Sequence, residues 1–149
     1  MKDGGLGRGI VEVILRGPDG RVKDREVVTN KLTEAGQAAI AEQLLDSPAI
    51  VTPKYMAVGE GEVEAKASDT TLGKELSPRK ALTSKTRSGN VVTMKAAWAA
   101  GEATGKITEA GVLTASSSGT LYLRTVFGLK TKEAGDTLEI VWKYTQEAA

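Results

Sequence analysis

The sequence predicts a mainly β fold, an antiparallel β-sandwich or barrel-like domain with one α-helix and an extended N-terminal arm and hairpin. Apolar residues alternate with polar ones in several short segments, and the segments after about residue 79 are joined by short turns rich in glycine. A strand with one apolar face is typical of antiparallel sheets that enclose a core. The alternating sets expected to build this core are Val92, Met94, Ala96 and Trp98; Leu121, Leu123 and Phe127; and Leu138, Ile140, Trp142 and Tyr144.

The N-terminal segment predicts an arm followed by a hairpin. The first nine residues, MKDGGLGRG, contain four glycines and no apolar period, so we expect a flexible arm. IVEVILR at 10–16 is rich in β-branched residues, GPDG at 17–20 is a strong turn signal, and RVKDREVV follows as a more polar strand. We therefore divide the chain into an arm and hairpin at residues 1–28 and a single β-rich core domain at residues 29–149.

One segment, at about residues 34–46, predicts a helix. Thr33 is the expected N-cap, Glu34 lies in the first turn, and Pro48 follows the end. Gly36 costs helix stability, which indicates close packing of the helix against a neighbour. The expected apolar stripe consists of Ile40, Ala41, Leu44 and Leu45.

The remaining elements are read from glycine, proline and strand-forming runs. KYMAVGEGE at 54–62 predicts a short strand that breaks at Gly59 and Gly61, and residues 62–78 predict a long surface loop. From residue 79 we expect four or five strands, with RKALTSKTR as the first and TLEIVWKYT as the last.

Composition narrows the classes of function. The 149 residues contain neither cysteine nor histidine, so thiolate and imidazole chemistry are excluded and an enzyme would have to use carboxylates, lysine or tyrosine. A formal net charge of +1 argues against nucleic-acid binding through the overall field. No apolar run reaches the ~20 residues that cross a bilayer, and the N-terminus has no signal-like segment, so we expect no membrane partner and synthesis in a cytoplasm-like compartment.

The stretch AGEATGKITEAG at 100–111 poses the main chemical question. Its two carboxylates could serve as an acid/base pair for glycoside hydrolysis if the fold held them roughly 5–10 Å apart. Sequence spacing shows no such pocket, so we favour a structural turn and expect no catalytic, metal or cofactor-binding residues. The turn residues are Gly101, Glu102, Gly105, Glu109 and Gly111.

A second candidate site is a run of basic residues between Lys74 and Arg87. On one β-strand, Arg79, Lys85 and Arg87 share parity and would point the same way. Such a stripe could bind nucleic acid or an acidic protein, but a solvated face that blocks strand addition is the favoured interpretation.

Several motifs resemble a family of structural proteins from tailed bacteriophages, which includes capsid decoration, head-fibre and tail-fibre subunits. The similarity runs from about Val27 to Thr145, and its most specific pieces are GEATGKITEAG, GTLYLRTVF and DTLEIVWK. Leu113 and Met94 stand where family members usually carry an aromatic residue. The resemblance implies a noncatalytic virion component that oligomerises, commonly as a trimer.

From this resemblance we expect a capsid decoration protein on the outside of the head, which binds the major capsid protein and clamps neighbouring subunits together. The arm and the IVEVILR strand would add to a neighbour's sheet edge. Residues expected at the capsid or partner contact are Ile10, Val11, Val13, Leu15, Arg79, Lys85 and Arg87. The alternatives are a tail or head fibre subunit with a receptor- or glycan-binding surface, a carboxylate glycosidase, and a nucleic-acid chaperone.

Overall fold

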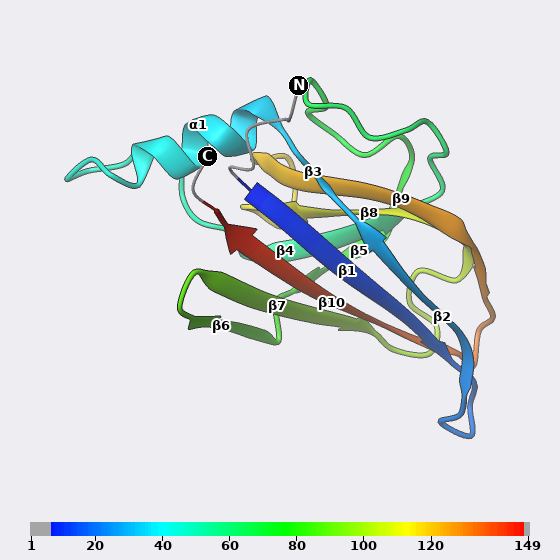
Figure 1. The fold of residues 1–149 in the computed structure, drawn as a ribbon. Helices are drawn as coiled ribbons and strands as arrows, with labels where there is room; N and C mark the ends of the chain where they lie inside the picture. The colour runs from blue at the N-terminus through cyan, green and yellow to red at the C-terminus, as the bar shows by residue number, and fades with distance from the viewer. Residues whose placement is uncertain (1–6, 148–149) are drawn as a thin grey trace.

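The computed structural model describes residues 7–147, which form two antiparallel five-stranded sheets packed face to face, with one short helix (Figure 1). This arrangement confirms the predicted mainly β fold with a single helix. The strand orders are β2-β1-β10-β7-β6 and β3-β9-β8-β4-β5. In chain order the elements are β1 (Gly7–Arg16), β2 (Val22–Thr29), β3 (Lys31–Leu32), α1 (Glu34–Glu42), β4 (Tyr55–Gly59), β5 (Glu75–Ala81), β6 (Ser84–Ser88), β7 (Val91–Trp98), β8 (Gly105–Leu113), β9 (Leu121–Lys132) and β10 (Thr137–Gln146).

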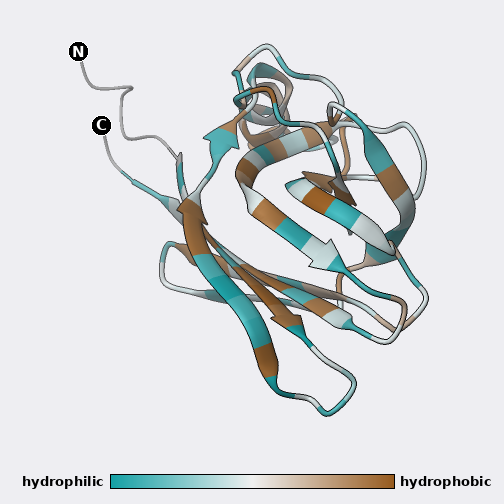
Figure 2. Cartoon of the chain, turned by 90° about the vertical axis from the view of Figure 1, so that its right-hand side faces the viewer, coloured by the Kyte–Doolittle hydropathy of each residue, from teal (hydrophilic) through white to brown (hydrophobic). Residues whose placement is uncertain are grey.

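The core fills the space between the two sheets, whose strands are striped with apolar and polar residues (Figure 2). The three alternating sets lie in it as predicted, except that Leu121 belongs to a smaller cluster with Ala57, Leu72 and Leu113. Trp98 and Trp142 are fully buried. The Trp98 indole N–H donates to the Pro78 carbonyl oxygen at 2.9 Å, and the Trp142 indole N–H donates to Asn30 Oδ1 at 2.8 Å. Burial of each indole contributes about 5 kcal/mol before entropic costs.

Strand β1 is a central strand of its sheet. It pairs with β2 along one edge and with β10 along the other, from Gly7 opposite Gln146 to Arg16 opposite Thr137. Residues 7–9 of the expected arm therefore belong to β1, and residues 1–6 lie outside the described residues. Because both edges of β1 are already paired, the prediction that this strand adds to a neighbour's sheet is wrong.

The inward side chains of β1 correct the predicted contact surface as well. Val11 and Val13 are 0% exposed and Leu15 is 3% exposed, because they form one wall of the core. These three residues cannot meet a partner, and that part of the prediction is wrong. Ile10, on the opposite face of the strand, is 54% exposed.

Ion pairs attach the hairpin to the rest of the sandwich. Lys23 Nζ on β2 lies 2.7 Å from the buried carboxylate of Asp136, and Glu26 lies 2.6 Å from the buried Lys130 on β9. The described part of the predicted N-terminal unit, residues 7–28, therefore shares one core and one ion-pair network with the remaining strands.

Helix α1 begins as predicted and ends early. The Thr33 hydroxyl accepts from Gly36 N–H at 2.9 Å, and a Cβ on Gly36 would lie 2.4 Å from the Tyr122 carbonyl oxygen, so the expected close packing is present. The helix ends at Glu42, not near residue 46. Leu44 and Leu45, assigned to the apolar stripe, are 89% and 59% exposed because this part of the chain extends beyond the sheets (Figure 1).

Three boundaries differ after the helix. The surface loop ends at Lys74, since residues 75–78 already belong to β5, whose first two residues pair with β4. The predicted strand RKALTSKTR is divided between β5 and β6, which lie in different sheets. The predicted turn at 100–111 is shorter than expected, because residues 105–111 form most of β8.

Candidate functional site

Glu109 lies in the middle of β8, between Gly59 on β4 and Val126 on β9. Its side chain is 0% exposed, which an ionised carboxylate tolerates only when it is fully hydrogen-bonded. Five N–H groups supply those bonds. Its Oε2 accepts from Gly61 N and Lys74 N, both at 2.7 Å, and its Oε1 accepts from Gly73 N at 2.8 Å and from two nitrogens of Arg124 at 2.9 and 3.1 Å.

The Arg124 guanidinium extends this centre toward the surface. Its side chain is 3% exposed and also reaches the Asp69 carboxylate at 2.9 Å and the Val63 carbonyl at 3.0 Å. Asp69 in turn accepts from Lys66 N at 2.8 Å. The buried ion pair therefore organises the whole loop between β4 and β5, which has no strand or helix of its own.

Glycines allow this loop to approach the carboxylate. A Cβ added to Gly61 would lie 2.5 Å from Glu109 Oε2, and one added to Gly59 would lie 2.3 Å from the Lys74 carbonyl oxygen. The GEG sequence at 59–61 thus serves close backbone approach to a carboxylate, which accounts for its glycines without a phosphate.

The hydrogen bonds decide the charge of Glu109. Burial alone would raise the pKa of this carboxyl, but the N–H groups of Lys74 and Gly73, the Arg124 guanidinium and Gly61 N–H together lower the pKa below its usual value. A general acid at neutral pH needs a raised pKa and contact with substrate. Glu109 has neither, so its chemistry is that of a structural anion.

Glu102 lies in the turn between β7 and β8 and has separate partners. Its carboxylate accepts from Lys80 Nζ at 2.9 and 3.0 Å and from Ala99 N at 2.7 Å. The hydrogen bond from Lys80, followed by that from Ala99 N–H, lowers the pKa of this carboxyl. Positive φ angles at Gly101 (83°) and Ala103 (49°) turn the chain here. Glu102 and Glu109 share no hydrogen-bond partner among the described residues.

The predicted basic stripe is not formed. Arg79 is on β5 and is held by Glu75 at 2.7 Å and by the carbonyl oxygens of Ala115 and Ser118 at 2.9 and 2.8 Å. Lys85 and Arg87 are on β6, in the other sheet. The parity argument is therefore wrong, because the chain changes sheets between Arg79 and Lys85.

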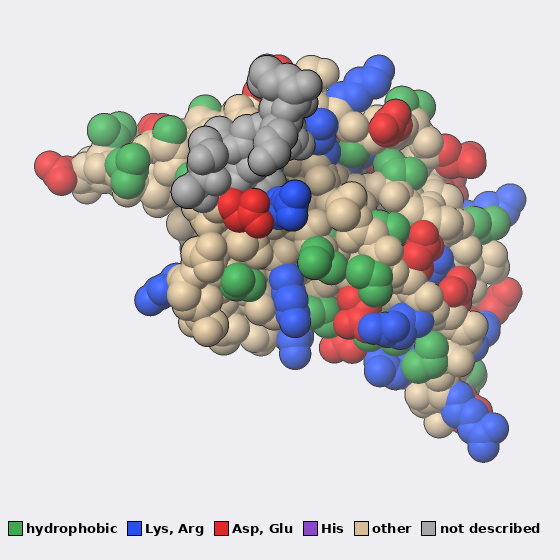
Figure 3. Space-filling model, in the orientation of Figure 1, with side chains coloured by type: hydrophobic (Ala, Val, Ile, Leu, Met, Phe, Trp, Pro, Cys, Tyr) green, Lys and Arg blue, Asp and Glu red, His purple; other side chains and the backbone are tan. Residues whose placement is uncertain are grey.

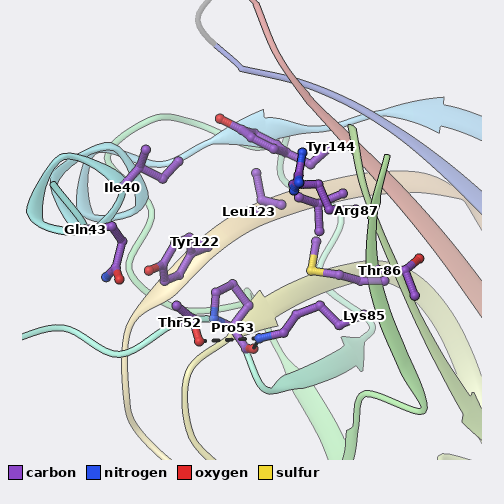
Figure 4. A pocket seen from close by; sticks show the side chains of 12 residues that line it. Ile40, Gln43, Thr52, Pro53, Lys85, Thr86, Arg87, Tyr122, Leu123 and Tyr144 are labelled. Atoms are coloured by element: carbon purple, nitrogen blue, oxygen red, sulfur yellow. Dashed lines mark hydrogen bonds between the residues drawn. The ribbon is translucent and has the colours of Figure 1, made fainter. Parts of the chain in front are cut away.

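Lys85 and Arg87 instead stand at the rim of an apolar pocket of about 370 Å³ between the sheets (Figure 4). A pocket of this size, lined mainly by apolar and aromatic side chains with a few polar groups, has the usual character of a binding site. The walls come from α1 and the segment after it, from β6 and β7, and from the ends of β9 and β10. The lining residues are Ile40, Gln43, Thr52, Pro53, Lys85, Thr86, Arg87, Val92, Met94, Tyr122, Leu123 and Tyr144.

Polar atoms around the pocket are directed into the protein. Lys85 Nζ donates to the Pro53 carbonyl at 2.7 Å, and the Tyr122 hydroxyl donates to the Val51 carbonyl at 3.1 Å. Burial, and next the nearby Lys54, lower the pKa of Lys85, whereas burial and then Glu42 raise the pKa of Tyr122. Lys85 is itself exposed at the surface, whereas the Tyr122 side chain is buried.

We also searched the described residues for a metal site and for a membrane-spanning helix. Within residues 7–147 no three carboxylates converge closely enough to hold a metal ion. The same residues include no helix with the length and apolar character needed to cross a membrane.

Sequence reasoning missed the partner of Glu109 and the pocket. Arg124 carried a usable signal, because it interrupts LYLRTVF, a strand whose neighbours on both faces are buried. A charge at such a position requires an opposite charge nearby. The pocket had no comparable signal, since its lining comes from six separate segments of the chain.

Comparison with protein-family models, curated proteins and solved structures yields no match to this chain.

Proposed function

We propose that this chain is a noncatalytic structural subunit of a tailed-bacteriophage virion, a capsid decoration protein that binds the outer head surface as a homo-oligomer. The proposal rests on the resemblance of the segment from about Val27 to Thr145 to structural proteins of tailed bacteriophages. In this proposal the protein is made in the host cytoplasm, assembles as a trimer and contacts the major capsid protein on the capsid exterior.

The noncatalytic assignment is supported by Glu109, because structural hydrogen bonds occupy both oxygens of its carboxylate. Its two oxygens accept five hydrogen bonds, its side chain is 0% exposed, and its partners hold the loop between β4 and β5. The carboxylate most specific to the motif GEATGKITEAG therefore stabilises a surface loop. A binding or scaffold protein needs such ordered loops, whereas a hydrolase needs an accessible carboxylate.

The exposed face of the β1–β2 hairpin is the surface we assign to the shell. Ile10 is 54% exposed on β1 and Val27 is 52% exposed on β2, and both border a depression with Val126 of β9. Strand β2 is also an edge of its sheet. An apolar patch beside an edge strand can pack against a partner and pair with its backbone.

Co-sedimentation with empty shells of the major capsid protein encoded with this chain tests the assignment. Wild-type protein should pellet with the shells, and the double variant Ile10→Ser/Val27→Ser should bind at least about tenfold more weakly, because two apolar contacts are lost. Val63→Ser is the matched control, since Val63 is 69% exposed on the loop between β4 and β5.

Absence of wild-type binding to the shells would contradict the proposal. Unchanged binding of the double variant would contradict the assigned surface. Deletion of residues 1–16 is a poor test of either, because it removes a central strand of the sandwich.

A further inference from the structure

The segment that follows α1 forms a projecting loop with exposed apolar side chains. We call this loop the knob and define it as residues 44–51. Leu44, Leu45 and Val51 are 89%, 59% and 51% exposed. The knob extends beyond both sheets (Figure 1), and hydrophobic side chains gather on this extension in the surface view (Figure 3). Neighbouring exposed leucines on a projecting loop mark an interaction surface more often than isolated apolar residues do.

Hydrogen bonds at its base hold the knob in one shape. Gln43 Nε2 donates to the Ile50 carbonyl at 2.8 Å, and Ala49 N donates to the Glu42 carboxylate at 3.2 Å. Leu44 N and Leu45 N continue the helical turn by donating to Ala41 and Glu42 carbonyls at 3.1 and 2.9 Å. A loop ordered before binding loses less conformational entropy when it docks.

The apolar pocket lies next to the knob in the same chain and is not filled by it. Gln43 and Thr52, on either side of the knob, line the pocket, whereas Leu44 and Leu45 do not. Tyr122 of the pocket wall donates to Val51 in the knob at 3.1 Å. One subunit therefore presents an apolar projection and an apolar cavity side by side.

The charges around the two features are opposite. Lys85 and Arg87 stand at the rim of the pocket, and within residues 7–147 neither has a carboxylate partner. Asp46 lies beside the leucines of the knob, is exposed, and forms no ion pair with any other described residue. Glu42 lies at the base of the knob but is also close to Tyr122 of the pocket wall, so Asp46 is the charge that distinguishes the knob from the pocket. Complementary charges around an apolar contact fix its orientation and disfavour other partners.

We propose that the knob of one subunit docks into the apolar pocket of a second copy of this chain, with Asp46 facing Lys85 and Arg87. This contact would bury the exposed leucines and fill the cavity, so a single contact accounts for both features. Because knob and pocket adjoin, two subunits can exchange knobs reciprocally, or three can close a ring, without leaving an open end. The inference deepens the proposed function, since it rests on the self-association proposed there.

Analytical ultracentrifugation of the full chain tests the apolar part of the contact. Wild-type protein should sediment as a closed oligomer of the 15.6 kDa subunit. Leu44→Ser/Leu45→Ser should raise its dissociation constant at least about tenfold. Both leucines are exposed, so the variant keeps its core, and the exposed Val63→Ser is the control. Wild-type protein that stays monomeric at about 1 mM, or an unchanged constant in the double variant, would overturn the proposal.

Charge reversal tests the orientation without changing the apolar surfaces. Asp46→Lys and Arg87→Glu should each weaken association by about threefold or more, and the combination should recover most of the loss. Arg21→Glu, at a position whose side chain is 90% exposed on the β1–β2 turn, should leave association unchanged. Additive losses in the combined variant would contradict the proposed facing of Asp46 and Arg87.

Filling the pocket separates a second copy from a small ligand as its occupant. Val92→Trp places a larger side chain into the cavity and should prevent association while the thermal transition remains cooperative. A monomeric wild-type protein that carries a bound anionic amphiphile in native mass spectrometry would assign the pocket to that ligand and overturn the proposal. If the protein associates through the knob but does not bind shells, only the decoration role is refuted. If the protein binds shells as a monomer, only the knob-and-pocket contact is refuted.

Discussion

Replacing Glu109 with glutamine keeps the shape of the side chain and removes its charge. Arg124, with a side chain only 3% exposed, would then lose its buried counterion, and Asp69 at 2.9 Å would be its remaining acidic partner. The amide NH2 group would also face backbone N–H donors of Gly61 and Lys74, or of Gly73, because both carboxylate oxygens accept from the backbone. The change therefore leaves buried donors without acceptors.

The expected loss of stability is large. Breaking a buried ion pair by removing one partner costs about 3–5 kcal/mol, against a total unfolding free energy of about 5–15 kcal/mol for a domain. With a urea m-value of about 2 kcal/mol/M, the unfolding midpoint should fall by roughly 2 M. Glu102→Gln should lower the midpoint far less, because both side chains of the Glu102–Lys80 pair are 30% exposed and solvent screens their attraction.

Urea unfolding followed by tryptophan fluorescence measures both variants, since Trp98 and Trp142 are buried in the core. A Glu109→Gln midpoint equal to that of wild type, or a larger loss from Glu102→Gln, would refute the assignment of Glu109 as the anion that holds the loop. Neither wild type nor either variant should hydrolyse glycosides, because the proposed function is noncatalytic.

The same substitution changes how stability depends on pH. The pKa of Glu109 is lowered in the folded protein, so its contribution is fully present above the ordinary glutamate pKa of about 4.3 and is lost as pH falls through the lowered value. Wild type should therefore lose more stability than Glu109→Gln on acidification below about pH 4.3. Parallel pH curves for the two proteins would contradict the lowered pKa.

Three further outcomes follow from the geometry. Gly61→Ala should destabilise the protein by about 1–3 kcal/mol in urea unfolding, because its Cβ would lie 2.5 Å from Glu109 Oε2. Absorbance titration of Tyr122 should give a pKa above that of free tyrosine, and Glu42→Gln should lower it, since burial and then Glu42 raise this pKa. Asn30→Ala should cost about 1–3 kcal/mol, because it leaves the buried Trp142 N–H, now donating at 2.8 Å, without an acceptor.

Much of the fold could be predicted because strand periodicity is local information. The alternating sets around Trp98 and Trp142 identified inward faces correctly, and Thr33 marked the start of the helix. The β-branched residues of IVEVILR indicated a strand, but composition does not say whether its apolar side chains meet the strand's own core or a partner's. The position of β1 between β2 and β10 decides it.

The candidate sites were less predictable, because they depend on contacts between distant residues. Glu109 receives its backbone hydrogen bonds from residues 35 to 48 positions away in the chain. Its position in AGEATGKITEAG therefore indicated a bend, whereas the structure places it in a strand that braces another loop. Likewise, Leu44 and Leu45 fit the stripe of a longer helix, and only the extent of the sheets shows that nothing in the described chain covers them.

The most direct test of the proposed function is cryo-electron microscopy of virions from a phage whose genome encodes this chain. We expect β-sandwich density on the outer capsid surface, in closed oligomers, with the β1–β2 hairpin toward the shell and the knob of each subunit in the pocket of the next. Density for this chain in the tail, or virions without it, would contradict the capsid decoration role.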